Sequence, residues 1–260
     1  MKRYRTPVIV SSVIGVLVLA IIAVALWQAP RGVAQDQQPI LQYPEFPPTP
    51  TIGPNPTTPA VLQSGAPLVA ATFDDASALS AWQIVDLEFV LPDSASVWAV
   101  EDGRLTQNAT AAAGNPSIQE TAALIGEAGW TDYSVSVNFY DLHNGTAGLI
   151  ARYSGDDPTT ASYYRFRILK NSFEASPKQV LEKVTGGVAT TLVEIKEPGF
   201  SERAWHTLAM SVNGGAITVS LDGTVVAEAV DPAPLAAGRA GIYTRAIGGM
   251  LFDDFAVVQP

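Results

Sequence analysis

The sequence predicts an all-β protein built as a two-sheet antiparallel sandwich. The clearest sign is the stretch from Ala204 to Ala227, where apolar residues alternate with polar or small ones until Asn213-Gly214-Gly215 and Asp222-Gly223 interrupt them. Alternation at period two between glycine-containing turns is typical of an antiparallel meander with one buried face. Similar short runs recur at spacings of about 8–12 residues without a sustained helical period, which favours a sandwich or barrel.

The predicted strands follow one another from residue 68 to the C-terminus, and turn sequences such as Gly186-Gly187 and Pro198-Gly199 separate them. The expected strands are Leu68–Phe73, Trp82–Phe89, Val97–Gln107, Ile118–Leu124, Tyr133–Asp141, Ala147–Tyr153, Ser162–Leu169, Gln179–Val184, Ala189–Ile195, Trp205–Val212, Ala216–Leu221, Thr224–Ala229, Gly238–Thr244 and Met250–Val258. A short helix is expected at Ala76–Ala81.

We expect the first and last strands of this domain to pair antiparallel. Thr72-Phe73-Asp74-Asp75 begins the domain and Leu251-Phe252-Asp253-Asp254-Phe255 nearly ends it. The chain ends of a compact domain usually lie close together.

The N-terminal residues predict a membrane anchor. Residues 1–6 carry three basic side chains, and residues 7–27 are apolar or uncharged. As a helix, the second segment spans roughly 30 Å, the thickness of the hydrocarbon core. The preceding positive charges predict a cytoplasmic N-terminus and a single-pass protein of the cell membrane whose C-terminal domain is extracytoplasmic. A cleaved signal peptide, with Gly32-Val33-Ala34 as its cleavage sequence, is the alternative.

Residues 28–67 predict a proline-rich, disordered linker. Nine of the 19 prolines lie between Pro39 and Pro67. Proline lacks an N–H donor and fixes φ, so such a segment acts as a semi-rigid spacer of roughly 3 Å per residue. A role as a PxxP ligand is the weaker alternative, because most partners of that kind are intracellular.

Charge and composition exclude several classes of function. Residues 68–260 contain 11 basic and 23 acidic side chains, a formal charge of −12, which argues against binding nucleic acid or an anionic membrane surface. The chain has no Cys, which excludes disulfides, thiolate metal sites and a Cys nucleophile. The sequence does not identify a protein partner.

Several strand sequences resemble one family of sandwiches. They are Gly148–Tyr153, Tyr163–Ile168, Trp205–Leu208, Ile217–Gly223, Gly238–Tyr243 and Phe252–Phe255. Together they are similar to concanavalin A-like lectin and glucanase domains, in the laminin-G-like and keto-disaccharide-hydrolase-like branches. The resemblance covers most of residues 68–260 and implies a jelly roll of two curved sheets, whose concave face often handles carbohydrate.

The glucanase members of that family use an E-x-D-x-(x)-E strand motif, which this sequence lacks. Glu101-Asp102 precedes Gly103 and predicts a hairpin turn, while Glu194, Glu197 and Glu202 lie around a predicted loop. Glycoside hydrolysis ordinarily needs two carboxylates about 5–10 Å apart. Since no local pair is present, the sequence favours a protein without catalytic activity, although distant strands could still bring two acids together.

The alternation of inward and outward residues also predicts a ligand surface. On residues 133–140, Asn138 and Tyr140 should point away from the core; on residues 162–169, Tyr163, Arg165 and Arg167 should do so. If the two strands are neighbours, these five side chains form one surface. Tyrosine rings stack on sugar faces, and Arg and Asn hydrogen-bond hydroxyls. An ordinary solvated sheet face is the alternative.

Trp82, Trp98, Trp130 and Trp205 are expected to pack in the core or at sheet edges.

No cofactor is predicted, and Ca²⁺ is the one open alternative. His143 and His206 lack the spacing of metal ligands. Asp74, Asp75 and the Asp253-Asp254 pair would meet if the terminal strands pair, and clustered carboxylates can hold Ca²⁺. Turn caps and solvated acids are the preferred interpretation of these residues.

These observations predict a membrane-anchored, extracytoplasmic, non-catalytic binding module for carbohydrate. The alternatives are a saccharide-active hydrolase and a protein-interaction or structural domain displayed at the cell surface.

Overall fold

The computed structural model describes residues 52–53, 65–88, 95–108, 120–142, 145–169, 178–197, 199–245 and 249–260. All of them belong to one compact unit, Ile52–Pro260. The predicted tail 1–6, the apolar segment 7–27 and most of the linker 28–67 lie outside the described residues. Among the residues that are described, no helix has the length and apolar character needed to cross a bilayer.

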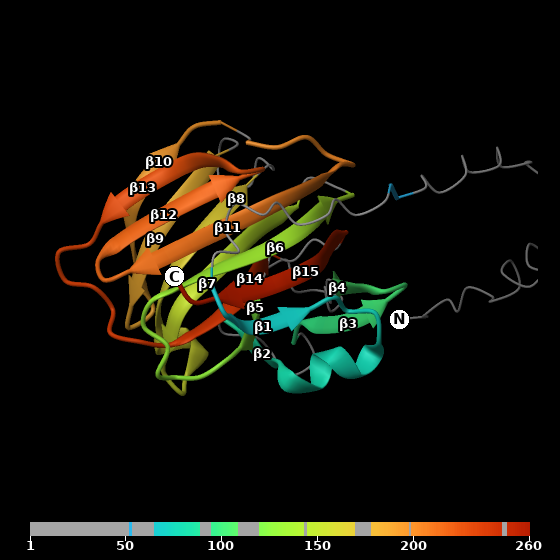
Figure 1. The fold of residues 1–260 in the computed structure, drawn as a ribbon, viewed down its shortest axis with the longest axis horizontal. Coiled ribbons are helices and arrows are strands. Elements are labelled where there is room, and N and C mark those ends of the chain that lie inside the picture. Colours follow the sequence, from blue (N-terminus) through green and yellow to red (C-terminus); the bar gives the residue numbers. More distant parts are fainter. Residues whose placement is uncertain are drawn as a thin grey trace, which may run out of the picture. The chain divides into compact units, whose positions relative to one another are not determined.

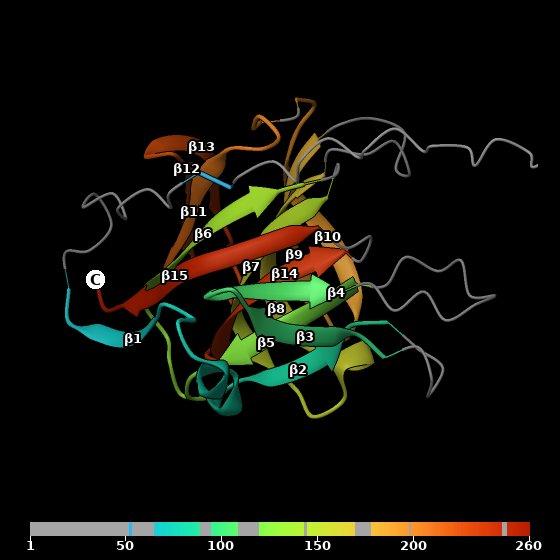
Figure 2. The ribbon, with the colours of Figure 1, turned by 90° about the vertical axis from the view of Figure 1, so that its right-hand side faces the viewer.

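The described chain forms two antiparallel sheets that face each other, so the predicted all-β sandwich is confirmed and is consistent with a jelly roll (Figures 1 and 2). Within the described residues, the eight-stranded sheet has the order β13 (Thr224–Val230), β12 (Ala216–Leu221), β11 (Trp205–Asn213), β6 (Tyr133–Asp141), β15 (Met250–Val258), β4 (Arg104–Asn108) and β3 (Val97–Glu101), with β1 (Pro67–Ala71) beside β15. The seven-stranded sheet has the order β10 (Val188–Ile195), β9 (Lys178–Thr185), β8 (Ser162–Leu169), β7 (Thr146–Ser154), β14 (Arg239–Arg245), β5 (Glu120–Ile125) and β2 (Gln83–Asp86).

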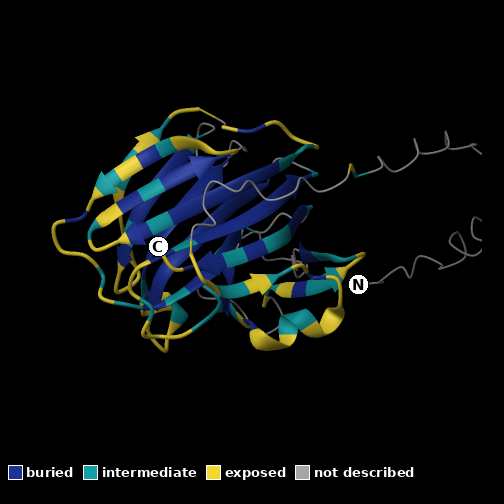
Figure 3. Ribbon diagram, viewed as in Figure 1, coloured by how far each residue is buried: buried dark blue, intermediate teal, exposed yellow. Residues whose placement is uncertain are grey.

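Alternate residues of both sheets meet in the main hydrophobic core between them. A second cluster of buried residues, which includes Tyr153, Tyr163 and Tyr243, lies on the other side of the seven-stranded sheet. Buried stretches of both sheets are dark blue in Figure 3. The predicted inward residues of β6 and β8 are all in the main core; they are Tyr133, Val135, Val137, Phe139, Tyr164, Phe166 and Ile168. Complete burial of such a side chain contributes roughly 1.5–3 kcal/mol. The alternation prediction is therefore confirmed for both strands.

The terminal strands pair antiparallel as predicted, with Ala71 opposite Phe255. The hairpin turn predicted at Glu101-Asp102-Gly103 is confirmed, and it divides the expected strand Val97–Gln107 into β3 and β4. Its turn residues Asp102 and Gly103 take left-handed backbone conformations, with φ of 51° and 71°, as two-residue hairpin turns require.

The expected short helix is confirmed as the 3₁₀ helix η2 (Ala76–Ala81). Asp75 caps it, because its side chain accepts a hydrogen bond of 2.7 Å from the Ser77 N–H. A second 3₁₀ turn, η4 (Pro158–Thr160), precedes β8 and is capped in the same way by Asp157.

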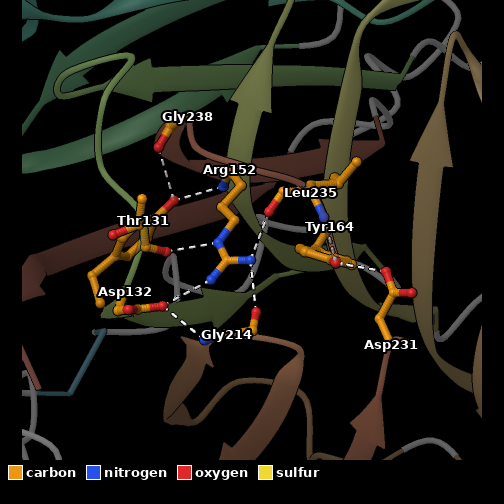
Figure 4. A network of polar contacts seen from close by, with 9 residues as sticks. Thr131, Asp132, Arg152, Tyr164, Gly214, Asp231, Leu235 and Gly238 are labelled. Atoms are coloured by element: carbon orange, nitrogen blue, oxygen red, sulfur yellow. Dashed lines mark hydrogen bonds and ion pairs between the residues drawn. The ribbon is translucent and has the colours of Figure 1, made fainter. Parts of the chain in front are cut away.

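A buried arginine ties together the loops at one end of the sandwich (Figure 4). Arg152 interrupts the pairing of β7 with a φ of 52°, and only 2% of its surface is exposed. Its guanidinium donates to the carbonyl oxygens of Thr131 at 2.6 Å, Leu235 at 2.7 Å and Gly214 at 2.8 Å, and to the Asp132 carboxylate at 3.0 Å. One side chain thus connects three loops.

The backbone of the same residue is held by Tyr133 of β6. The Arg152 N–H donates to Tyr133 Oη at 2.6 Å, and this hydroxyl lies 3.2 Å from the carbonyl oxygens of Gly238 and Arg239. Because buried polar groups are costly without partners, these contacts allow the charge and the strained backbone of Arg152 to be buried.

A buried carboxylate, that of Asp231, holds another loop at this end of the molecule. Asp231 accepts hydrogen bonds from Tyr164 Oη and Lys183 Nζ, each at 2.7 Å, and from the Ala233 N–H at 2.9 Å. Burial alone would raise the pKa of Asp231, but these three hydrogen bonds and the Lys183 charge hold it below its ordinary value.

We expect Arg152→Lys to destabilise the fold by about 3 kcal/mol, because one ammonium cannot reach the three carbonyls and the carboxylate together. Urea unfolding of the full chain measures the loss. Arg203→Lys, at an exposed position, is the matched control and should change stability by less than about 0.5 kcal/mol. Equal stabilities of the two variants would contradict the role assigned to Arg152.

We expect Asp231→Asn to lower stability most at neutral pH. A carboxyl with a depressed pKa stabilises the folded state above its unfolded pKa, and the contribution is lost as pH falls. The stability difference from wild type should therefore shrink as pH drops below the ordinary value of 3.8. Thermal unfolding between pH 2 and 7 measures it. Asp156→Asn, which is exposed, should show little difference throughout; a constant gap for Asp231→Asn would refute the linkage.

Candidate functional site

The outer face of the seven-stranded sheet carries a buried group of charged side chains. It consists of Glu120 from β5, Arg165 and Arg167 from β8, Glu182 from β9 and Tyr243 from β14, and we call it the Arg–Glu cluster. Arg165 lies directly opposite Glu182 in the β8–β9 ladder. Only 4% of the surface of each of these two residues is exposed.

The two arginines bridge the two glutamates. Both guanidinium groups contact Glu182: Arg165 Nη2 lies 2.8 Å and Arg167 Nε 2.9 Å from Oε2, and Arg167 Nη2 lies 3.1 Å from Oε1. Arg165 Nη1 also contacts Glu120 Oε2, and Arg167 Nη1 lies 3.4 Å from Glu120 Oε1. The two positive and two negative charges therefore balance within the cluster.

A glycine makes room for the tyrosine of this cluster. Gly148 of β7 pairs with both Tyr243 and Arg167 across its two neighbouring ladders. A Cβ at this glycine would lie 2.7 Å from Tyr243 Cδ1 and 2.5 Å from the Phe166 carbonyl oxygen. The Arg165 guanidinium in turn lies 5.0 Å from the centre of the Tyr243 ring, within the range of a cation–π contact.

Among the described residues, the buried Tyr243 hydroxyl makes no hydrogen bond of good geometry, although the Glu120 carboxylate is close enough to act on it as an acceptor. Burial raises the pKa of Tyr243 well above its ordinary value, and the Glu120 carboxylate adds to that effect while Arg165 and Arg167 oppose it. The hydroxyl thus keeps its proton. An unsatisfied buried hydroxyl costs free energy, roughly 1–3 kcal/mol, so this atom stands out within the cluster.

The charges of the cluster shift the pKa values of its own members and of nearby Glu88. Burial alone would lower the pKa of Arg165, but the negative charges of Glu120 and Glu182 raise it above its ordinary value. Glu88, beyond the end of β2, has its pKa raised by partial loss of hydration and by repulsion from Glu120. Raised carboxyl pKa values are typical of functional sites, although structural ion pairs also produce them.

Aromatic rings continue this face toward the other end of the sheet. Tyr153 and Tyr163 stack with centroids 5.6 Å apart and planes 18° from parallel, and the Arg239 guanidinium lies 5.5 Å from the Tyr153 ring. Burial raises the pKa of Tyr163 to about 12. This side of the sheet therefore combines charged hydrogen-bonding groups with buried aromatic rings.

The structure divides the predicted ligand surface into two parts. Tyr163, Arg165 and Arg167 share the outer face of β8 as predicted. Asn138 and Tyr140 belong to β6, which lies between β11 and β15 in the other sheet. The expectation that the two strands are neighbours is wrong, because alternation assigns a face to each residue and gives no information about which sheet contains the strand.

On the eight-stranded sheet, Asn138 is part of a buried polar chain. It donates to Asp254 Oδ2 at 3.2 Å and accepts from Thr207 Oγ1 at 2.7 Å. The ring of Tyr140 lies 5.5 Å from that of Trp205. Of the four tryptophans expected in the core or at sheet edges, Trp82 and Trp98 are core residues, whereas Trp205 lies half-buried on the outer face.

Sequence reasoning missed Glu120, Glu182 and Tyr243. Alternation would have placed Glu182 outward, because Leu181 of the same strand is a core residue. The same rule places Tyr243 outward, next to the core residue Ile242. No sequence signal shows that these side chains meet, because β5, β9 and β14 come together through the sheet order.

His206 forms an arrangement that resembles a catalytic triad in outline. Its Nδ1 lies 2.7 Å from Asp222 Oδ2, and its Nε2 lies 3.3 Å from Ser201 Oγ. Nε2 is closer, at 2.9 Å, to the carbonyl oxygen of Ser201, which can only accept a proton. Nε2 therefore acts as a donor here, and the ring, packed between Phe139 and Phe200, serves to fix the loop.

The aspartates considered for Ca²⁺ make local hydrogen bonds. Asp74 accepts from Thr72 Oγ1 at 2.6 Å, Asp75 caps η2, and Asp253 accepts from the Asp254 N–H at 2.8 Å. Among the residues described here, no group of three or more His, Cys, Asp or Glu side chains is arranged to hold a metal ion.

Comparison with known proteins places this sandwich in a family. Residues 70–254 match the model of the 3-keto-alpha-glucoside-1,2-lyase-like domain. The chain belongs to this family. No curated protein sequence matches it.

Solved structures with the fold of this lyase-like domain share little sequence with it. A Bacillus subtilis protein of unknown function with a galectin-like fold has a TM-score of 0.59 and 15% identity, over 76% of this chain and 98% of that chain. The Bacillus licheniformis β-glucanase has a TM-score of 0.53 and 15% identity, over 76% and 100%. The Bacillus subtilis carbohydrate-binding module CBM66 has a TM-score of 0.51 and 15% identity, over 69% and 96%. These similarities show that this chain shares the fold of the three proteins.

Two tyrosines offer a matched test of the site geometry. We expect Tyr243→Phe to leave the stability of the full chain unchanged or to raise it by up to about 1 kcal/mol, because it removes a buried hydroxyl that makes no hydrogen bond of good geometry. Tyr133→Phe should cost about 1–3 kcal/mol, because it leaves the Arg152 N–H without an acceptor. Urea unfolding compares the two. A larger loss for Tyr243→Phe than for Tyr133→Phe would show that the Tyr243 hydroxyl is bonded in the folded protein.

Proposed function

We propose that this protein is a non-catalytic saccharide-binding module whose ligand site is the outer face of the seven-stranded sheet around the Arg–Glu cluster. The observation that supports this most strongly is the cluster itself. Buried ion pairs are costly, and well-packed apolar residues of similar volume are often as stable or more so. A sheet face that keeps two arginines and two glutamates is therefore a candidate for recognition.

The chemistry of this face suits a hydroxyl-rich ligand. Each guanidinium offers several N–H donors in a fixed plane, and each carboxylate offers acceptor oxygens. Sugar hydroxyls donate and accept, so they can bond to both groups. The stacked Tyr153 and Tyr163 rings lie next to the cluster, but only 2% and 4% of their surfaces are exposed, so they support the charged groups from within.

The geometry favours binding over glycoside hydrolysis. Hydrolysis needs one carboxyl that delivers a proton and a second that acts as nucleophile or base. In the Arg–Glu cluster, both Glu120 and Glu182 have oxygens in contact with two guanidinium groups. Neither carboxylate is free for that chemistry without breaking its ion pairs.

A saccharide-active enzyme is the second candidate. The family match, to a lyase-like domain, favours it. Glu88 adds support, because its raised pKa is the property expected of a general acid or base. This candidate predicts release of sugar products on incubation with the ligand, whereas the binding module releases none.

We also propose that residues 7–27 anchor the domain and that the domain faces the extracytoplasmic side. The uncharged length of this segment and the basic residues before it support the proposal. External protease should remove a C-terminal tag from intact cells while the tagged chain sediments with membranes. Protection of the tag would contradict this orientation.

The binding proposal is tested with the full chain in detergent on a broad glycan and polysaccharide panel. We expect a specific ligand, and we expect Glu120→Gln to weaken its binding by about tenfold or more, because hydrogen bonds to a charged group are worth roughly 1.5–3 kcal/mol. The matched control is Glu228→Gln, an exposed position on β13 of the other sheet.

Titration calorimetry of the first hit measures both variants, and chromatography of the same mixtures detects any product. Equal affinities for Glu120→Gln, Glu228→Gln and wild type would exclude the Arg–Glu cluster as the ligand site. Products in the mixture would replace the binding module with the enzyme. A folded wild-type protein that binds nothing on the panel would count against both.

A further inference from the structure

The outer face of the eight-stranded sheet carries a second distinctive surface, on the opposite side of the sandwich from the Arg–Glu cluster. It consists of Arg104, Tyr140 and Trp205, and we call it the tryptophan site. The Trp205 and Tyr140 rings lie 5.5 Å apart, and the Arg104 guanidinium lies 5.9 Å from the Trp205 ring. Trp205 and Arg104 are half-buried, whereas only 4% of the surface of Tyr140 is exposed, so the Trp205 ring is the one that borders on solvent.

The strand register places these side chains in a row that crosses the sheet. Trp205 is opposite Tyr140 across β11 and β6, Tyr140 is opposite Leu251 across β6 and β15, and Leu251 is opposite Thr106 across β15 and β4. The row thus offers two aromatic rings followed by aliphatic surface. Arg104 adds a cation beside the rings.

The occupant of this site is visible in the structure. Trp205 Nε1 donates a 3.0 Å hydrogen bond to the carbonyl oxygen of Gly53. Gly53 and the half-buried Ile52 are separated from the next described residue, Gly65, by 11 positions of the linker. In sequence, Gly53 lies within PPTPTIGPNP, residues 47–56, where five of ten residues are proline.

We propose that the tryptophan site is a recognition site for a proline-rich extended segment, and that its ligand is the linker of this same chain at Ile52-Gly53. Proline-rich segments have few N–H donors but keep every carbonyl, so a site for them must supply donors and flat apolar surface. A tryptophan N–H beside a second aromatic ring is the arrangement by which aromatic grooves bind such segments. The Gly53–Trp205 hydrogen bond is one contact of this kind.

This site gives the linker a defined point of attachment. If residues 7–27 form the anchor, the free tether is residues 28–51, which is 24 positions, in place of the 40 positions of 28–67. At about 3.1 Å per residue, its maximum reach falls from about 125 Å to about 75 Å. The attachment lies on the eight-stranded sheet, so the linker at Ile52-Gly53 leaves the face with the Arg–Glu cluster uncovered.

The test uses the full chain with 5-fluorotryptophan at its five tryptophans, and Trp205→Phe assigns the Trp205 fluorine signal. The test variant is Pro50→Ser/Ile52→Ser/Pro54→Ser. The matched control is Pro39→Ser/Ile40→Ser/Pro44→Ser, which removes the same residue types upstream.

We expect the Trp205 signal of the test variant alone to move to an exposed position, with indole N–H exchange accelerated about tenfold by loss of the hydrogen bond. A synthetic peptide of residues 47–57, at about 10 mM to exceed the millimolar effective concentration of a tethered segment, should restore the wild-type signal. The wild-type signal should not depend on protein concentration, because the contact is within one chain.

Three results would overturn the proposal. An unmoved Trp205 signal in the test variant would show that the linker is not the ligand. An equal shift in the control variant would show that the effect does not depend on residues 50–54. A peptide without effect would show that the site does not recognise the proline-rich sequence itself.

Discussion

Successive residues of β8 point to opposite sides of the seven-stranded sheet, and this single geometric constraint connects the core to the candidate site. Tyr164, Phe166 and Ile168 must enter the core for the two sheets to hold together. Tyr163, Arg165 and Arg167 are then forced outward, next to Glu182 of β9. A shift of register by one residue would exchange the two sets and bury both arginines between the sheets. Stability of the sandwich therefore fixes the positions of the charged groups.

Alternation also explains how far the sequence alone predicts this molecule. It identifies the strands and the inward residues, because both depend on neighbours in sequence. It cannot place β6 and β8 in the same or in different sheets, because strand order depends on contacts between distant segments. For that reason the sequence predicts the outward orientation of Tyr140 correctly but groups it with residues of the other sheet. Glu120 and Tyr243 escaped notice because only the sheet order brings β5 and β14 toward β8.

Arg152 and the pair Arg165 and Arg167 are all buried, but they contact different kinds of groups. Arg152 is surrounded by backbone carbonyls and one carboxylate, and its contacts join three loops. The burial of Arg152 is therefore explained by its role in holding these loops together. Within the described residues, Arg165 and Arg167 join side chains of neighbouring strands on one sheet face. The fold gains little from these charges that apolar residues could not supply. The ligand proposed for this face would explain why its charged groups are kept.

The two outer faces also differ in chemistry, and the difference matters for a tethered domain. Near Trp205 the eight-stranded sheet offers rings, an aliphatic side chain and an indole donor to a segment of the chain itself. The seven-stranded sheet offers two arginines and two glutamates whose charges balance. A linker that docked on the second face would compete with any ligand there at the high effective concentration of a tethered segment. Docking on the first face avoids this competition, because a proline-rich strand satisfies the indole N–H and cannot satisfy two arginines and two glutamates.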